Sequence, residues 1–277
     1  MPVDLAQLLT DLRDETEVVD ELISELEASQ WNLPTPAEGW SITDQVSHLA
    51  YFDDAATLAA SDPDRFRAEA EVLVAHGPDF TESVAERYHA LPPAELLAWF
   101  RRSRAHYLET FATLDPGARL PWYGPSMSAA ISVTARLMET WAHGLDIADA
   151  VGRTTPPSMR LRHVAHLGVA TFGFAFRSHG LDVPDTAVRF ELDAPDGTTW
   201  TWGDPGAAEM VAGPALDFCL VATQRRHPDD TGLTTTGAVA AKWLTIAQAF
   251  AGPPGSGRYP LERVEPTGPS DRPPEVA

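Results

Sequence analysis

Met138-Glu139-Thr140-Trp141-Ala142-His143-Gly144-Leu145-Asp146 lies inside a long, mostly apolar run that is typical of one helix. Glu139 and His143 are four residues apart in this segment. Because an α-helix has about 3.6 residues per turn, both side chains point to the same face. A carboxylate and an imidazole on one helix face can bind the same metal ion. The segment therefore predicts two ligands of a metal site.

His48 is the best candidate for the third ligand. It lies in a second predicted helix, within Ser47-His48-Leu49-Ala50-Tyr51-Phe52-Asp53. Two histidines and one glutamate leave a coordination position open for water or substrate, which suits a catalytic site better than a closed structural one. We expect Asp44 or Asp146 to pair with the other ring nitrogen of a ligating histidine.

The competing interpretation of Glu139 and His143 is an amphipathic helix with an ordinary buried histidine, because this spacing often arises by chance. The surrounding residues are small or apolar, however, so the pair is expected to be buried. A buried glutamate costs roughly several kcal/mol unless a positive charge compensates it. A divalent cation would do so, which favours the metal site. His163 and His166 form a weaker candidate pair, because no carboxylate lies beside them.

Composition and charge exclude several classes of function. The chain has 277 residues, of which 44% are hydrophobic, as in a globular protein. Its 40 acidic and 20 basic residues give a formal net charge of −20, which repels phosphate backbones and anionic membranes. We therefore expect no nucleic-acid partner and no membrane partner. No uncharged apolar run reaches membrane-spanning length.

The N-terminal residues and the cysteine content indicate a cytoplasmic protein. The chain does not begin with a basic region followed by an apolar segment, so no secretory signal is predicted. Cys219 is the single cysteine and cannot form an intramolecular disulfide. It lies between Phe218 and Leu220 on a predicted apolar helix, so we expect it to pack in a core rather than act as a nucleophile.

Helical periodicity predicts an up-and-down four-helix bundle in residues 1–152. The expected principal helices span about 5–26, 42–60, 93–114 and 126–151, with a short helix between 62 and 78 and another helical region at 80–91. The candidate ligands thus lie on the second and the last principal helix.

A change of pattern predicts a second domain, small and of the α+β class, in residues 153–251. Its expected elements are a linking helix at 158–178, strands at 188–193, 198–202, 209–211 and 233–235, and helices at 214–226 and 238–250. Asp196-Gly197 is a strong hairpin turn between the first two strands. Residues 252–277 are rich in proline, glycine and charge and are predicted to be a disordered tail.

The order of these motifs resembles the DinB-like metal-binding bundle, and most closely the mycothiol-dependent maleylpyruvate isomerase family of actinobacteria. The shared pattern is a tryptophan and a His-Leu on the second helix, here Trp40 and His48-Leu49, followed by Glu-x-x-x-His-x-x-Asp at residues 139–146. The resemblance implies that His48, Glu139 and His143 hold a divalent metal. Zinc is the usual metal, and this donor set also suits nickel or iron(II).

The second domain also resembles that family, in which it is similar to sterol-carrier folds. The family pattern is a Val-x-Gly element followed by a helix that ends in Gly-Arg, and this arginine helps to hold the thiol. Here Val211-Ala212-Gly213 leads to Gln224-Arg225-Arg226. The resemblance implies a thiol contact for Arg225 or Arg226 and leaves open which of the two. The alternative role for both is to complement the dipole at a helix C-terminus.

The function implied by the resemblance is that of a metal-dependent enzyme with mycothiol as cosubstrate, which isomerises a small electrophile or transfers the thiol to it. The metal would lower the pKa of the thiol and so supply thiolate. A metal-dependent hydrolase that uses no thiol and a non-catalytic metal-binding and ligand-binding protein stay open as alternatives. Trp40, Trp122 and Tyr123 are candidates to line the pocket for thiol or substrate. Neither the substrate nor the oligomeric state is predicted.

Overall fold

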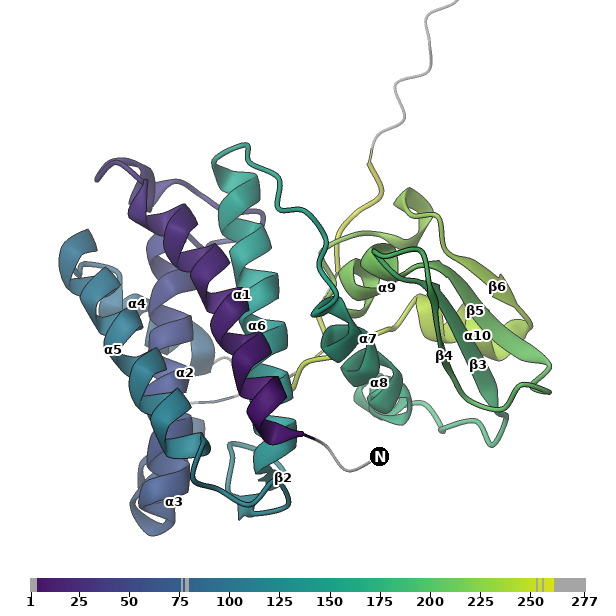
Figure 1. Cartoon of the computed structure of the whole chain (residues 1–277), viewed down its shortest axis with the longest axis horizontal. Coiled ribbons are helices and arrows are strands. Elements are labelled where there is room, and N and C mark those ends of the chain that lie inside the picture. The colour runs from purple at the N-terminus through teal and green to yellow at the C-terminus, as the bar shows by residue number, and fades with distance from the viewer. Residues whose placement is uncertain (1–3, 76, 78–79, 253, 256, 262–277) are drawn as a thin grey trace, which may run out of the picture.

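The computed structural model describes residues 4–75, 77, 80–252, 254–255 and 257–261. Figure 1 shows a bundle of long helices beside a smaller unit that contains a twisted sheet, with two short helices between them. The predicted fold class, a helical bundle followed by a small α+β unit, is confirmed.

Four long helices form the bundle. They are α1 (Leu5–Ser24), α2 (Ile42–Ser61), α5 (Pro93–Phe111) and α6 (Ala129–Ala150). Helix α2 packs against α5 and α6, and α1 packs against the same two helices from the other side. Two shorter helices, α3 (Pro63–Val74) and α4 (Phe80–Tyr88), lie along α2. A 3-10 turn, η1 (Gln30–Asn32), precedes α2, and the small hairpin β1 (Arg119–Leu120) and β2 (Met127–Ser128) precedes α6.

The start of α2 is set by a capping box. The Ser41 hydroxyl accepts a hydrogen bond from the Asp44 backbone N–H, and the Asp44 carboxylate accepts one from the Ser41 N–H at 2.8 Å. Two backbone donors that the helix leaves unpaired are thereby satisfied. This cap determines where the first two turns begin, and those turns carry Gln45 and His48.

Helices α1 and α6 approach closely at Gly144, within the segment that carries the candidate ligands. A Cβ atom at this position would lie 2.8 Å from Cγ2 of Val19 on α1, closer than side-chain atoms pack. Glycine therefore permits the approach. The neighbouring core is apolar and includes the fully buried Leu12 and Leu137.

A buried ion cluster joins three of the bundle helices. Asp53 on α2 is 0% exposed and accepts hydrogen bonds from Nε of Arg104 on α5, at 2.6 Å, and from Nε of Arg136 on α6, at 2.9 Å. Arg136 also donates to the Leu49 carbonyl, and Arg104 to the Thr140 hydroxyl, both at 3.0 Å. Buried charges are tolerated when they are paired and hydrogen-bonded in this way.

The second unit is built on a four-stranded mixed sheet. Its strands are β3 (Val188–Asp193), β4 (Thr199–Trp202), β5 (Glu209–Pro214) and β6 (Thr234–Thr236), in the order β4-β3-β5-β6. Strand β3 pairs antiparallel with β4 and parallel with β5. The helices are α7 (Leu161–Ala170), α8 (Phe172–Ser178), α9 (Ala215–Ala222) and α10 (Ala238–Leu244), with a 3-10 turn, η2 (Pro228–Asp230).

Three predicted helices of this unit differ from those observed. The single helix expected at 158–178 is two helices, α7 and α8, separated at Thr171, whose hydroxyl donates back to the Leu167 carbonyl at 2.9 Å. Such a bond from a side chain to the preceding turn bends helices. Helix α9 ends at Ala222 rather than 226, because Gln224 adopts a left-handed φ of 60°. Helix α10 ends at Leu244 rather than 250.

The first residues of the predicted tail contact the rest of the protein. Arg258 pairs with Asp146 at 3.1 Å, and the Leu261 N–H donates to Asp230 at 2.8 Å. The remainder of the predicted tail, residues 262–277, lies outside the described residues. Within the described part of the chain, no helix is both long and apolar enough to cross a membrane.

Replacement of Asp53 by alanine is expected to destabilise the fold by about 3–5 kcal/mol, because it leaves two buried guanidinium groups without their counter-charge. Urea denaturation followed by circular dichroism measures this loss. Glu69→Ala is the control, since Glu69 pairs with Arg65 on an exposed helix surface and should cost less than about 1 kcal/mol. Equal losses in the two variants would contradict the structural role of the cluster.

Candidate metal centre

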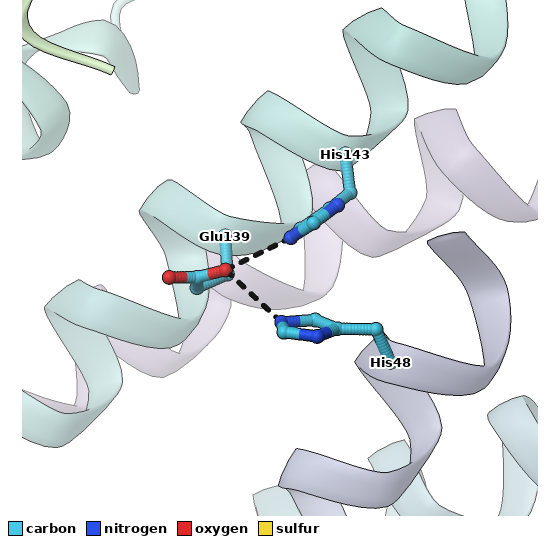
Figure 2. Close-up of side chains that lie close together, drawn as sticks. All are labelled: His48, Glu139 and His143. Carbon is cyan, nitrogen blue, oxygen red and sulfur yellow. Dashed lines mark hydrogen bonds and ion pairs between the residues drawn. The ribbon is translucent and has the colours of Figure 1, made fainter. Parts of the chain in front are cut away.

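The structure brings His48, Glu139 and His143 together between α2 and α6 (Figure 2). Oε2 of Glu139 lies 3.0 Å from Nε2 of His143 and 3.3 Å from Nε2 of His48. One potential ligand atom from each residue lies within 4.8 Å of the others. The side chains of His48 and His143 are only 12% and 9% exposed, whereas that of Glu139 is 23% exposed. The three groups thus meet at a nearly buried point that solvent reaches beside the carboxylate.

A chain of hydrogen bonds determines the tautomer of His143. The Thr35 hydroxyl donates to the Trp40 carbonyl at 2.9 Å, so it accepts the bond from the Gln45 side-chain amide at 2.8 Å. The amide oxygen of Gln45 then faces Nδ1 of His143, which must donate to it. With the ring proton on Nδ1, the Nε2 lone pair of His143 faces Glu139, 3.0 Å away. This tautomer is the one that binds a metal through Nε2.

The protonation states of the other two residues also suit a metal. Burial, together with the nearby His143, lowers the pKa of His48 to about 4, so its ring is neutral at pH 7. Burial alone would raise the pKa of Glu139, but the approach of the His143 and His48 rings outweighs this effect and holds the pKa well below its usual range. Nδ1 of His48 is buried and has no hydrogen-bond partner among the described residues. Two imidazoles and one carboxylate are a donor set that fits zinc, nickel or iron(II).

Aromatic rings cover the two histidines. The Trp40 ring is stacked on His143, with centroids 5.9 Å apart, and the Phe52 ring lies 4.5 Å from that of His48. The ring centroids of Trp122 and Tyr123 lie 6.1 and 5.7 Å from that of Phe52. Neither ring is paired with the ring of His48 or His143. Of the three predicted pocket residues, Trp40 therefore lies at the site, and the other two lie one ring farther away.

The prediction that Asp44 or Asp146 pairs with a ligating histidine was wrong. Asp44 is used in the cap of α2 and accepts a hydrogen bond from the exposed His89 at 3.0 Å. Asp146 pairs with arginines instead. The partner of His143 is Gln45, which was missed because a neutral amide is a less obvious partner than a carboxylate. Its position three residues before His48, on the same helix face, was the available signal.

The end of α9 distinguishes the two candidate arginines. The Arg225 N–H bonds to the Leu220 carbonyl and the Gln224 N–H to the Val221 carbonyl, which is the pattern of a Schellman cap. Gln224 occupies the left-handed position where glycine is favoured. Arg225 leaves this turn toward the bundle and pairs with Asp146 at 2.8 Å. Arg226 forms no ion pair with the described residues.

Comparison with known proteins shows which family has a sequence similar to that of this bundle. A family model described as the mycothiol maleylpyruvate isomerase N-terminal domain matches residues 12–148. Two strains of Mycobacterium tuberculosis each have a relative, an uncharacterized protein, that is 45% identical over 255 residues, which are 92% of this chain and 99% of the relative.

Two crystal structures share the fold of both units. The mycothiol-dependent maleylpyruvate isomerase has a TM-score of 0.58 and 18% identity, and a mutant of it with one histidine replaced by alanine has a TM-score of 0.59. Each comparison covers 84% of this chain and 93% of the other. This chain belongs to the mycothiol maleylpyruvate isomerase family, and the matched segment contains all three candidate ligands.

Replacement of Gln45 by leucine is expected to weaken metal binding by about 10–100-fold, because His143 loses the acceptor that holds its tautomer and ring orientation. Competition with a fluorescent zinc chelator measures the affinity without reference to activity. Gln45→Glu keeps an acceptor at the same place and should bind zinc at least as tightly as the wild type does. Wild-type affinity in Gln45→Leu would contradict the hydrogen-bond chain.

The metal-free protein is expected to lose stability in acid through His48. The pKa of His48 is about 4 in the folded state and 6.5, the ordinary value for histidine, in the unfolded state, so the unfolded chain binds the proton first. The contribution of neutral His48 to the free energy of unfolding is complete above pH 6.5 and is lost as the pH falls toward 4. Between pH 7.5 and 5 the loss should be about 2 kcal/mol. Urea denaturation at both pH values should show a smaller acid loss in His48→Gln; an unchanged loss would contradict this assignment.

Proposed function

We propose that this protein is a metal-dependent enzyme that uses a small-molecule thiol, mycothiol, to isomerise a small electrophilic substrate or to transfer the thiol to it. The observation that carries the proposal is the convergence of His48, Glu139 and His143 at a point that solvent reaches from one side. Three ligands from the protein leave a position for an exogenous group, as in catalytic rather than structural sites. Membership of the family supports mycothiol as that group.

Each residue of the site has a distinct role in this proposal. His48, Glu139 and His143 bind the metal, with zinc expected and nickel or iron(II) also suited to the donor set. A divalent metal, when bound, lowers the pKa of a coordinating thiol and makes thiolate available at neutral pH. Gln45 orients the His143 ring through Nδ1. Trp40 and Phe52 keep water from the faces of the two imidazoles.

The protein's own cysteine does not compete for the role of nucleophile. Cys219 is 0% exposed in the second unit, and its Sγ donates to the Leu161 carbonyl at 3.5 Å. Burial raises the pKa of this thiol, which keeps it in the unreactive protonated form. These facts support a thiol supplied by a small molecule.

The aromatic cluster beside the site supplies an apolar wall for the carbon skeleton of the substrate. Phe52 contacts the His48 ring on one side and the rings of Trp122 and Tyr123 on the other. We assign Trp122 and Tyr123 to substrate binding, and Arg225, whose turn faces the bundle, to binding of the thiol or the substrate.

Metal-loaded protein is expected to convert an activated cis-alkene such as maleylpyruvate when mycothiol is present. His143→Ala should lower kcat/KM more than about a hundredfold, because losing a ligand is more severe than the 10–100-fold effect of losing a partner behind it. Inductively coupled plasma analysis of the same samples should show reduced metal content. His163→Ala is the matched control, since His163 pairs with Asp11 away from the site.

Three results would overturn this proposal. Full turnover in metal-free protein would remove the role of the metal. Turnover without any thiol would indicate a hydrolase. Equal metal content in wild type and His143→Ala would show that these residues are not ligands.

A further inference from the structure

Asp146 is held by two arginines that come from different segments of the chain. Nη2 of Arg225, after α9, donates to Oδ2 at 2.8 Å, and Nη2 of Arg258, after α10, donates to Oδ1 at 3.1 Å. The carboxylate is 1% exposed, whereas the arginine side chains are 17% and 27% exposed. Asp146 is therefore buried inside the protein, while both arginine side chains keep some exposed surface.

The cluster of Asp146, Arg225 and Arg258 meets α6 on the same face as the candidate metal centre. Asp146 follows Glu139 by seven residues, which is two helical turns or about 10 Å along the axis. It follows His143 by three residues, which is less than one turn. The arginine cluster and the candidate ligands therefore lie on one side of the same two turns of α6.

The group has the charge and the donors that an anion requires. Arg225 and Arg258 share the Asp146 carboxylate. Asp149 and Arg226 also lie near this cluster, so three guanidinium groups face two carboxylates and leave a net positive charge in a protein whose formal charge is −20. Nε and Nη1 of Arg258 form no hydrogen bond with the described residues, and Nε of Arg225 is buried without a partner there. The planar fork of a guanidinium matches the two oxygens of a carboxylate.

We propose that Arg258 is a specificity-determining residue that, together with Arg225, binds a carboxylate group of the substrate. The family pattern concerns an arginine at the end of α9, whereas Arg258 belongs to a segment beyond α10 that this pattern does not include. Asp146 is a positioning residue here, because it holds the two guanidinium groups next to each other. The assignment of the carboxylate to the reacting substrate rests on the proposed function, while carboxylate binding itself does not.

Calorimetric titration of the metal-loaded protein, without thiol, tests this site. The probes are succinate and its neutral diamide, succinamide. The wild type should bind succinate and not succinamide. Arg258→Gln should weaken succinate binding by about tenfold or more, as expected for the loss of a charge-assisted hydrogen bond. Arg258→Lys should lie between the two, because it keeps the charge and loses the fork.

Arg160→Gln is the matched control. Arg160 precedes α7 and pairs with Glu15 of the bundle at 2.7 Å, so it also links the two units but contacts neither Asp146 nor its arginines. This variant should bind succinate as the wild type does. Equal weakening in Arg160→Gln and Arg258→Gln would reduce Arg258 to a link between units and overturn the proposal. Wild-type affinity in Arg258→Gln, or no succinate binding by the wild type, would overturn it as well.

A separate assay of thiol turnover distinguishes this inference from the proposed function. Arg258-dependent succinate binding without turnover would refute the proposed function and support the carboxylate site. Turnover without Arg258-dependent binding would refute the carboxylate site alone. Where both hold, Arg258→Gln should raise KM for a carboxylated electrophile more than it lowers kcat.

Discussion

The bundle depends on one buried carboxylate that must be neutralised from two sides. Asp53 has no exposed surface, and Arg104 and Arg136 approach it from α5 and α6. Any of these three charges would destabilise the core if it were buried without a partner. The three helices must therefore pack so that the three charged groups meet. Asp53 lies five residues after His48, and Arg136 three before Glu139. The ion cluster therefore also sets how the two halves of the candidate metal centre face each other.

The loop before α2 carries out two tasks at once. Its last residue, Ser41, caps the helix, and Thr35 anchors the amide of Gln45 while donating to the Trp40 carbonyl. Through Gln45 the loop determines which ring nitrogen of His143 is protonated. The Trp40 ring also stacks on that histidine. Local backbone structure and the chemistry of the site are thus coupled through a few hydrogen bonds.

Helix α6 connects the candidate metal centre to the second unit. One face carries Glu139 and, two turns later, Asp146, which receives Arg225 from the end of α9. A Schellman cap, with Gln224 in a left-handed conformation, directs Arg225 toward Asp146. A non-glycine residue in this region is strained by about 1 kcal/mol or more. The strain persists because the cap and the ion pair hold the turn.

The sequence alone determined the elements with strong periodicity and the chemistry that follows from local spacing. The four bundle helices, the β3–β4 hairpin and the shared face of Glu139 and His143 depend on neighbours close in the chain, so their patterns are visible without a fold. Only the tertiary structure decided that Gln45 rather than Asp44 or Asp146 supports His143, that Arg225 rather than Arg226 turns toward the bundle, and that α7 and α8 are separate. Those outcomes depend on which groups meet across helices and on how buried polar atoms are satisfied. Spacing along the chain does not contain that information.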